Sequence, residues 1–226
     1  MARFALLLSY NGAFFSGWQV QPGRATVQGE LETAIGKITG ENVRITGASR
    51  TDAGVSAIGQ VAHLDIKHNF NKYKMLRSIN SLTSSDIVVK SIVNVEDTFH
   101  ARYAALGKRY RYTTEGDVLK LREIADLFTG EHNFAAFAVT RSVPDNPVCT
   151  IWRSEWHRAG NGVVIYIIEG DRFLHKMVRM IVGAQLSYGR GRLTRDALER
   201  MLRSGERDLR WRVAPAERLL LERIFY

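Results

Sequence analysis

The spacing of apolar and polar residues predicts strands and helices that alternate irregularly along the chain. Apolar residues three and four positions apart predict helices from Thr26 to Gly40 and over 75–82, 121–128, 174–189 and 194–203. Thr26 is a suitable N-cap, and Gly40 stands where a left-handed C-terminal cap belongs. Residues 131–149 have little periodicity and are predicted to form an ordered loop. Short apolar runs predict strands at 3–10, 43–47, 59–66, 86–95, 103–114, 150–158, 163–169 and 218–225.

The connections between the predicted strands favour antiparallel pairing. Gly160-Asn161-Gly162 is a strong hairpin signal because Asn and Gly tolerate positive φ. Hairpins take the place of regular strand–helix–strand crossovers, so we predict an α+β fold with a mainly antiparallel sheet and helices packed on it. The order of elements before Tyr112 is loosely repeated after it, which predicts two similar halves, 1–112 and 113–226.

Composition places the chain among globular proteins. Of its 226 residues, 45% are apolar and 10% aromatic, which is enough to bury a core. No apolar run approaches the ~20 residues that a membrane span needs, and residues 1–8 lead into a strand pattern without a cleavage site. We therefore expect a cytoplasmic protein that does not enter a membrane.

Cysteine and histidine usage narrows the chemistry. Cys149 is the single cysteine, so an internal disulfide and a CxxC metal site are excluded, and only a lone catalytic thiol stays open. The histidines do not fall at a metal-ligand spacing, and we expect surface or packed imidazoles and no metal. They are His63, His68, His100, His132, His157 and His175.

The formal charge of +9 comes mostly from arginine, with 24 Arg against 8 Lys. Guanidinium groups bind phosphates bidentately and stack on bases, which ammonium groups do not do. Two stretches, 99–112 and 172–195, contain no acid, and the first interleaves its cations with aromatic rings. That pattern favours binding to a nucleic acid with exposed bases. The cations of these stretches are Arg102, Lys108, Arg109 and Arg111, then Arg172, Lys176, Arg179, Arg190, Arg192 and Arg195.

A polar turn at 48–56 between two predicted strands holds Asp52 between Arg50 and Gly54. The nearby arginine can keep the carboxylate ionised through a charge-assisted hydrogen bond, and glycine allows a sharp turn. An ionised, positioned carboxylate is a nucleophile or a general base. A structural turn in which the aspartate caps backbone N–H groups is the alternative that these residues leave open.

Six blocks of sequence, in the same order, resemble the TruA family of tRNA pseudouridine synthases. The first block combines Tyr10-Asn11-Gly12, Gly17-Trp18-Gln19 and Thr26-Val27-Gln28. The second is residues 47–61 around Asp52. The others are Phe99-His100-Ala101-Arg102 with Arg109-Tyr110-Arg111-Tyr112, residues 130–134, residues 173–183, and Ala214-Pro215-Ala216-Glu217.

The resemblance implies isomerisation of uridine to pseudouridine at positions 38, 39 and 40 of the tRNA anticodon stem-loop, without cofactor or metal. It implies a basic cleft between two halves that share one continuous sheet, and a homodimer that binds tRNA. Asp52 would be the catalytic nucleophile, although attack at C1′ and proton removal at C2′ both stay open. Arg50 would help displace the base, Tyr110 would stack on the uracil, and Arg179 would pair with the carboxylate. The substrate-binding residues would be Tyr110, Gln19, Arg102, Lys108, Arg109, Arg111 and Lys176.

The chain departs from the family pattern in four places. Ser56 stands where most relatives have histidine, Thr83 replaces a proline, and Arg218 replaces a glycine. The segment after Tyr112 is shorter than usual, which bears on tRNA binding and dimerisation. Two other functions stay open at this point: an RNA-binding protein without catalysis, and a glycosylase or hydrolase that acts on RNA.

Overall fold

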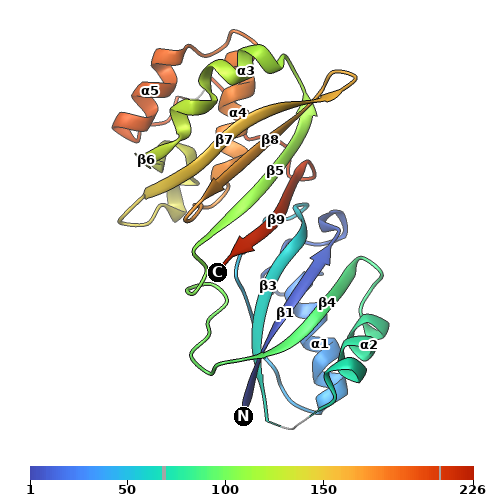
Figure 1. Cartoon of the computed structure of the whole chain (residues 1–226). Helices are drawn as coiled ribbons and strands as arrows, with labels where there is room; N and C mark the ends of the chain where they lie inside the picture. The colour runs from blue at the N-terminus through green and yellow to red at the C-terminus, as the bar shows by residue number, and fades with distance from the viewer. Residues whose placement is uncertain (68–69, 209) are drawn as a thin grey trace. The chain divides into compact units, whose positions relative to one another are not determined.

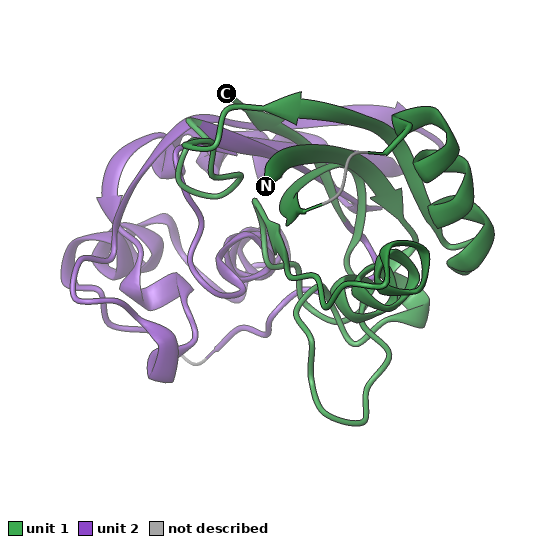
Figure 2. Cartoon of the chain, turned by 90° about the horizontal axis from the view of Figure 1, so that it is seen from below, with its two compact units in different colours: residues 1–106, 220–226 green, residues 107–219 purple. Residues whose placement is uncertain are grey.

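The apolar run at the start of the chain forms β1 (Ala2–Tyr10), a central strand of the computed structural model (Figure 1). The structure describes residues 1–67, 70–208 and 210–226, so His68 lies outside the described residues. Contacts group the chain into two compact units, residues 1–106 with 220–226 and residues 107–219 (Figure 2). Tyr112, where the sequence predicts a boundary, lies inside β5 (Gly107–Glu115) of the second unit.

In the first unit, β1 pairs antiparallel with β3 (Ser56–Ile66) on one side and with β4 (Ile87–Val95) on the other. The short β2 (Ile45–Gly47) also pairs antiparallel with β3. At its other end, β3 pairs in parallel with β9 (Leu219–Phe225), at Ser56↔Leu220 and Ala57↔Leu221. The helices α1 (Val27–Thr39) and α2 (Lys72–Leu82) cover one face of this sheet (Figure 1). A 3₁₀ turn, η1 (Gly12–Phe14), follows β1.

Local rules account for α1. The Thr26 hydroxyl accepts a hydrogen bond from the Gly29 amide, and Gly40 ends the helix with a φ of 73°. Its apolar stripe, from Val27 through Leu31 to Ile35, is fully buried. The helix that the sequence predicts between Thr26 and Gly40 is therefore confirmed.

The second unit is an antiparallel sheet in the order β5, β8 (Val163–Gly170), β7 (Val148–Gly160), β6 (Gly130–Asn133). The helices α3 (Val118–Ala125), α4 (Met177–Gly189) and α5 (Arg195–Ser204) lie on one side of it (Figure 1). Short 3₁₀ turns follow α3 and β6: η2 (Asp126–Phe128), η3 (Ala135–Phe137) and η4 (Thr140–Ser142).

A row of aromatic side chains forms the core of this second sheet. Tyr112, Tyr166 and Trp156 lie side by side on three neighbouring strands and are nearly or fully buried. The Trp156 indole donates to the Gln185 side chain of α4 at 2.7 Å, which ties the helix layer to the sheet. Burial raises the pKa of Tyr112 to about 12, so its hydroxyl stays protonated.

The α+β class and the mainly antiparallel pairing are confirmed, and so is the hairpin, because Asn161 has a φ of 48° and Gly162 one of 75°. Three predictions were wrong in detail. The strand expected from residue 103 begins only at Gly107, after turn residues at 101–103. The expected loop 131–149 contains most of β6, which pairs with β7. The helix expected from Leu174 begins only at Met177, because Lys176 adopts a left-handed φ of 61° and breaks the helical run.

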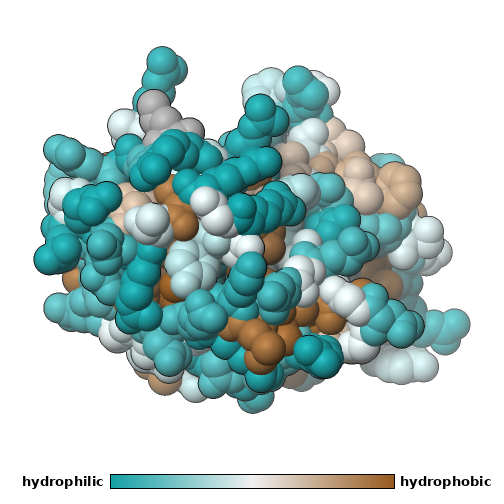
Figure 3. All heavy atoms as spheres, turned by 90° about the horizontal axis from the view of Figure 1, so that it is seen from above, coloured by the Kyte–Doolittle hydropathy of each residue, from teal (hydrophilic) through white to brown (hydrophobic). Residues whose placement is uncertain are grey.

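Most of the protein surface is polar, in contrast to the apolar core. On the face seen in Figure 3 most side chains are hydrophilic, and apolar atoms show in patches between them. The second unit carries more of the positive charge, with 20 Lys and Arg against 14 Asp and Glu. Within the described ranges, no helix is long and apolar enough to cross a membrane.

Candidate active site

Asp52 lies in the connection between β2 and β3, at the first position of a tight turn. The Val55 amide donates to the Asp52 carbonyl at 3.1 Å, and Gly54, at the third position, has a φ of 83°. A turn with this hydrogen bond and a left-handed third residue requires glycine there, because a side chain would strain it. The sequence Asp52-Ala53-Gly54-Val55 therefore dictates the local backbone that carries the carboxylate.

Two side chains from the first sheet hold the start of this loop. Gln60, in β3, accepts a hydrogen bond from the Ser49 amide at 3.1 Å and donates to the Ser49 carbonyl at 2.7 Å. The Tyr10 hydroxyl, at the end of β1, lies 2.7 Å from the Thr51 hydroxyl. Gln60 and Tyr10 are 0% and 4% exposed, so water does not compete for these bonds.

The segment after β1 holds the other side of the loop. The Trp18 amide donates to the Thr51 carbonyl at 3.1 Å, and the Gly54 amide donates to the Phe15 carbonyl at 3.4 Å. The Ser56 hydroxyl accepts from the Gly12 amide at 3.0 Å. Ser56, the departure from the usual histidine, thus ties the end of the loop to the segment beside it.

The side chains of the loop differ in exposure. Asp52 is partly exposed and Arg50 is exposed, while their neighbours Ser49 and Thr51 are buried. Arg50 follows the buried Ser49 in the loop, and its pairing with Asp52 stays a prediction. Gln19, also predicted as a binding residue, is partly exposed in the neighbouring segment.

In the second unit, β5 separates the predicted binding residues onto two faces of the sheet. Successive side chains of a strand point to opposite faces, so Lys108 and Tyr110 share the face of the buried Tyr112. Arg109 and Arg111 belong to the opposite face, where Arg109 Nε donates to the Glu169 carboxylate of β8 at 2.8 Å. The first basic cluster of the sequence is therefore not one surface.

Tyr110 is an ordered ring at the end of the aromatic core. It is 7% exposed, lies opposite Ile168 in β8, and meets the Phe173 ring edge to face, with centroids 5.2 Å apart. Aromatic pairs prefer this edge-to-face arrangement to a face-to-face sandwich.

The start of α4 carries the remaining predicted residues of this unit. Arg179 Nε donates to the Ala214 carbonyl at 2.8 Å, and the Ala214 amide donates to the Arg179 carbonyl at 3.1 Å. Lys176, just before the helix, is partly exposed and holds its left-handed φ. Asp52 belongs to the first unit and Arg179 to the second, so their pairing stays a prediction.

Arg102 is exposed in a turn of the first unit, after Phe99 and His100. Two hydrogen bonds hold this turn. The Ala101 amide donates to Nδ1 of the buried His63 at 3.1 Å, and the Tyr226 hydroxyl donates to the Ala101 carbonyl at 2.7 Å. Burial, together with the nearby His100 and Arg3, lowers the pKa of His63 below its ordinary 6.5. A neutral ring is required, because only an unprotonated Nδ1 accepts from Ala101.

This buried histidine predicts a pH dependence of folding. Below about pH 6.5 the unfolded chain binds a proton at His63 that the folded chain resists, so stability should fall as the pH drops from 7.5 to 5.5. Urea unfolding of wild type and His63→Gln at both pH values measures it. The variant, which cannot titrate there, should lose less stability than wild type over this range, and an equal loss would contradict the assignment.

Other candidate chemistry does not lead to a site. Cys149 is 1% exposed and burial raises its pKa to about 11, so the thiol stays protonated and packs in the core rather than acting as a nucleophile. In the part of the chain that the structure describes, no three His, Cys, Asp or Glu side chains cluster as metal ligands would.

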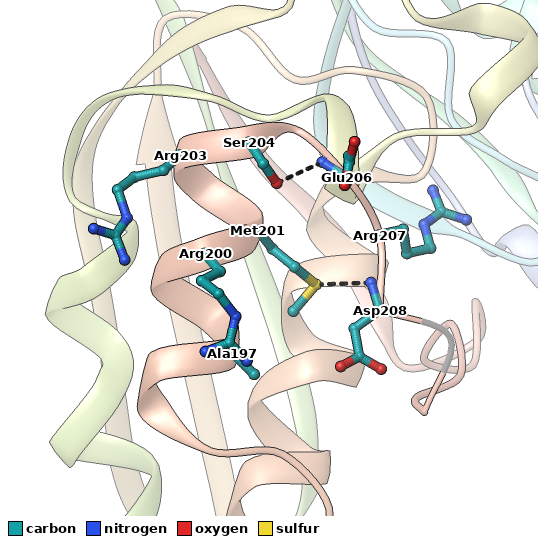
Figure 4. Close-up of a pocket in the computed structure, with 8 residues that line it drawn as sticks. All are labelled: Ala197, Arg200, Met201, Arg203, Ser204, Glu206, Arg207 and Asp208. Atoms are coloured by element: carbon teal, nitrogen blue, oxygen red, sulfur yellow. Dashed lines mark hydrogen bonds between the residues drawn. The ribbon is translucent and has the colours of Figure 1, made fainter.

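A hollow of about 450 Å³ lies in the second unit, beside the end of α5 (Figure 4). Its arginines point in different directions and two acids, Glu206 and Asp208, share its lining, so it does not form a converging anion site. Its lining residues are Ala197, Arg200, Met201, Arg203, Ser204, Glu206, Arg207 and Asp208.

Sequence reasoning gave no role to Tyr10 or Gln60, and it noted Ser56 only as a hydroxyl in place of the usual histidine. A signal existed for Gln60 alone: it is a polar residue within the otherwise apolar run Gly59-Gln60-Val61-Ala62 of a buried strand. A polar side chain at such a position needs hydrogen-bond partners. The partner itself, eleven residues earlier, follows only from the fold.

Comparison with known proteins identifies the family. Residues 8–104 and 124–226 match the family model described as tRNA pseudouridine synthase. A tRNA pseudouridine synthase A from Listeria monocytogenes serotype 4a (strain HCC23) is 33% identical over 247 residues, with 100% of both chains covered. One from Exiguobacterium sibiricum is 35% identical over 243 residues, covering 100% of this chain and 97% of its own.

The crystal structure of an archaeal box H/ACA sRNP Nop10-Cbf5 complex is also similar, with a TM-score of 0.40, 12% identity, and coverage of 81% of this chain and 44% of its own.

The family matches define an isomerase that modifies RNA and takes part in tRNA processing. The chain belongs to the tRNA pseudouridine synthase family, so the synthase is confirmed over the two alternatives that the sequence left open. The matched stretches include Arg50, Asp52 and Arg179 and leave out 105–123, where Tyr110 and the shortened segment lie.

Proposed function

We propose that this synthase isomerises uridine at positions 38, 39 and 40 of the tRNA anticodon stem-loop, with Asp52 as the catalytic carboxylate. The observation that carries the proposal is the loop 48–55, whose backbone is fixed at Ser49, Thr51 and Gly54 while the Asp52 side chain stays partly exposed. A fixed backbone places a reacting group without further loss of entropy when the substrate binds.

The isomerisation needs only side chains of the protein and the uridine itself. The bond between uracil N1 and ribose C1′ breaks, the base turns, C5 bonds to C1′, and the C5 proton leaves while N1 gains one. Atoms balance without a cofactor or metal, and a carboxylate can serve by attack at C1′ or by removing the C2′ proton.

Extrusion of the target base from a stem costs a few kcal/mol, and contacts from two side chains would offset this cost. Arg50 is exposed next to Asp52 and can enter the space that the base leaves. Tyr110, which meets the Phe173 ring edge to face, would stack on the extruded uracil. Arg179, held by its contacts with Ala214, would pair with the Asp52 carboxylate.

We also propose which residues contact the tRNA, the oligomeric state of the protein and its location. The exposed or partly exposed cations Arg102, Lys108, Arg111 and Lys176, with Gln19, would contact the tRNA, and Arg109 would support them from its pair with Glu169. A homodimer that binds one tRNA belongs to the same proposal, and light scattering on the purified protein tests it. Because tRNA is the substrate, we place the protein in the cytoplasm.

The position of the reaction is tested with three tRNA transcripts, each with a single uridine in the anticodon arm, at 38, 39 or 40, labelled with tritium at C5. We expect tritium release from all three, with the strand intact and the uridine recovered as pseudouridine. No release from any of the three transcripts, with release from a tRNA labelled at all its uridines, would overturn the assignment.

The proposed stacking predicts different results for two substitutions of Tyr110. Tyr110→Phe keeps the ring and its contact with Phe173, so it should bind tRNA within about twofold of wild type. Tyr110→Ala should bind about 5- to 150-fold more weakly, the equivalent of ~1–3 kcal/mol for one stacked base. Filter binding at fixed salt measures both, and a phenylalanine variant that binds as poorly as the alanine variant would contradict stacking.

A further inference from the structure

A network of buried polar side chains fixes the two residues on either side of Arg50. Gln60 holds both the amide and the carbonyl of Ser49, at 3.1 and 2.7 Å. Its Nε2 atom also lies 3.4 Å from the Tyr10 hydroxyl, which is 2.7 Å from the Thr51 hydroxyl. The network therefore runs from two strands of the sheet to residues 49 and 51 of the loop.

The network comes from a local irregularity of the sheet. β1 and β3 keep regular register to Leu8↔Gln60 and then shift, so that Tyr10 lies opposite Ala57. An irregularity of this kind re-aims side chains at the end of a strand pair. Here it leaves the Tyr10 hydroxyl within reach of both Gln60 and Thr51.

Fully satisfied polar networks in a buried site favour one geometry over its alternatives. Two hydrogen bonds from one amide fix the peptide groups on both sides of Ser49, and Thr51 is fixed by Tyr10 and by the Trp18 amide. Arg50 and Asp52 directly follow Ser49 and Thr51 in the chain. Their side chains therefore start from positions that Gln60 and Tyr10 set.

We propose that Gln60 is a positioning residue for the isomerisation: through Ser49 and Thr51 it sets the placement of Arg50 and Asp52 without touching the substrate. This inference rests on the proposed function of Asp52. A displacement of about 1 Å at a reacting group can cost about 100-fold in rate, so the loss of the network should appear in kcat.

The chain offers a matched control for this residue. Asn80, in α2, holds Val89 of β4 with the same pair of bonds, since its Nδ2 donates to the Val89 carbonyl at 2.9 Å and its Oδ1 accepts from the Val89 amide at 2.8 Å. It lies in the same unit and away from the loop. Asn80→Leu removes two hydrogen bonds to one backbone residue, as Gln60→Met does, although Asn80 is half-buried and Gln60 fully buried. The pair separates a loss of stability from a loss of placement.

The experiment compares Gln60→Met and Asn80→Leu in tritium release from tRNA, tRNA binding and thermal unfolding. We expect both to lower the Tm and both to bind tRNA within about twofold of wild type. Only Gln60→Met should lower kcat, by about 100-fold. Wild-type kcat in Gln60→Met, or the same loss in Asn80→Leu, would overturn the proposal.

Two further variants make the result decisive. If Gln60→Met does not fold, Tyr10→Phe tests the same network with the ring retained, and its kcat should fall about 10-fold at unchanged KM; an unchanged kcat overturns the inference. Asp52→Asn is assayed beside them. If it stays active, the proposed function fails; if it is inactive while Gln60→Met is fully active, only the positioning role fails.

Discussion

Asp52→Asn should abolish tritium release, with a rate at least about 1,000-fold below wild type. Asparagine has the same shape, and the turn it occupies is held by the Asp52 backbone carbonyl and by Gly54, so the loop should keep its geometry. What disappears is the charge that either attack at C1′ or proton removal at C2′ requires. Removing a negative charge near a polyanion should leave tRNA affinity unchanged or slightly higher.

The measurement is single-turnover tritium release, with binding followed in parallel. Asp97→Asn is the control, because it removes an exposed acid of the same unit outside the loop, and we expect wild-type rates from it. If Asp52→Asn releases tritium at a rate close to that of wild type, Asp52 is a structural turn residue and not the catalytic carboxylate.

Gly12→Ala should have the second largest effect, because Gly12 lies against the backbone of the loop. A Cβ atom at this position would lie 2.2 Å from the Val55 carbonyl oxygen and 2.8 Å from the Gly54 carbonyl carbon. Neither is a flexible side chain, so the loop itself must move. We expect a loss of about 3 kcal/mol of unfolding free energy and at least about 100-fold in kcat.

Gly36→Ala is the matched control for Gly12→Ala. Its Cβ atom would lie 3.2 Å from the Glu41 carbonyl, a small overlap, and alanine favours the helix by up to about 1 kcal/mol over glycine. We expect near wild-type stability and activity from it. Urea unfolding and tritium release measure both variants, and a fully active Gly12→Ala would show that the loop is not held as the structure indicates.

Local sequence rules predicted the parts of the fold that depend on local contacts. The N-cap at Thr26 and the hairpin at Asn161-Gly162 follow from residue types at fixed positions, and both are present. β6 was not predicted because Gly-Glu-His-Asn has little strand propensity of its own. It is a strand because residues 130–133 pair with 148–151 of β7.

In the candidate site, too, local features could be predicted from the sequence and long-range contacts could not. Asp52 could be selected because Gly54 marks a turn and Arg50 lies beside it in the sequence, but neither residue shows what holds the loop in place. The residues that hold the loop come from β1, β3 and the segment after β1, and a linear sequence does not show which side chains meet there.

The sequence of the basic cluster at 99–112 also shows which face of the strand each side chain occupies. Alternation along β5 puts Tyr110 and Arg109 on opposite faces, and that period can be read from any predicted strand. Counting cations within a window treats the strand as if it had one face. The structure instead separates a stacking candidate from an arginine already paired with Glu169.

The central claim is that Asp52 converts anticodon-arm uridines to pseudouridine, and one measurement tests it most directly. Pseudouridine is mapped in the tRNA of a bacterial strain that lacks its own tRNA pseudouridine synthase A and carries either the wild-type chain or Asp52→Asn. We predict pseudouridine at positions 38, 39 and 40 with the wild type and at none of them with the variant. Restoration by Asp52→Asn, or pseudouridine gained by the wild type only outside the anticodon arm, would contradict the account.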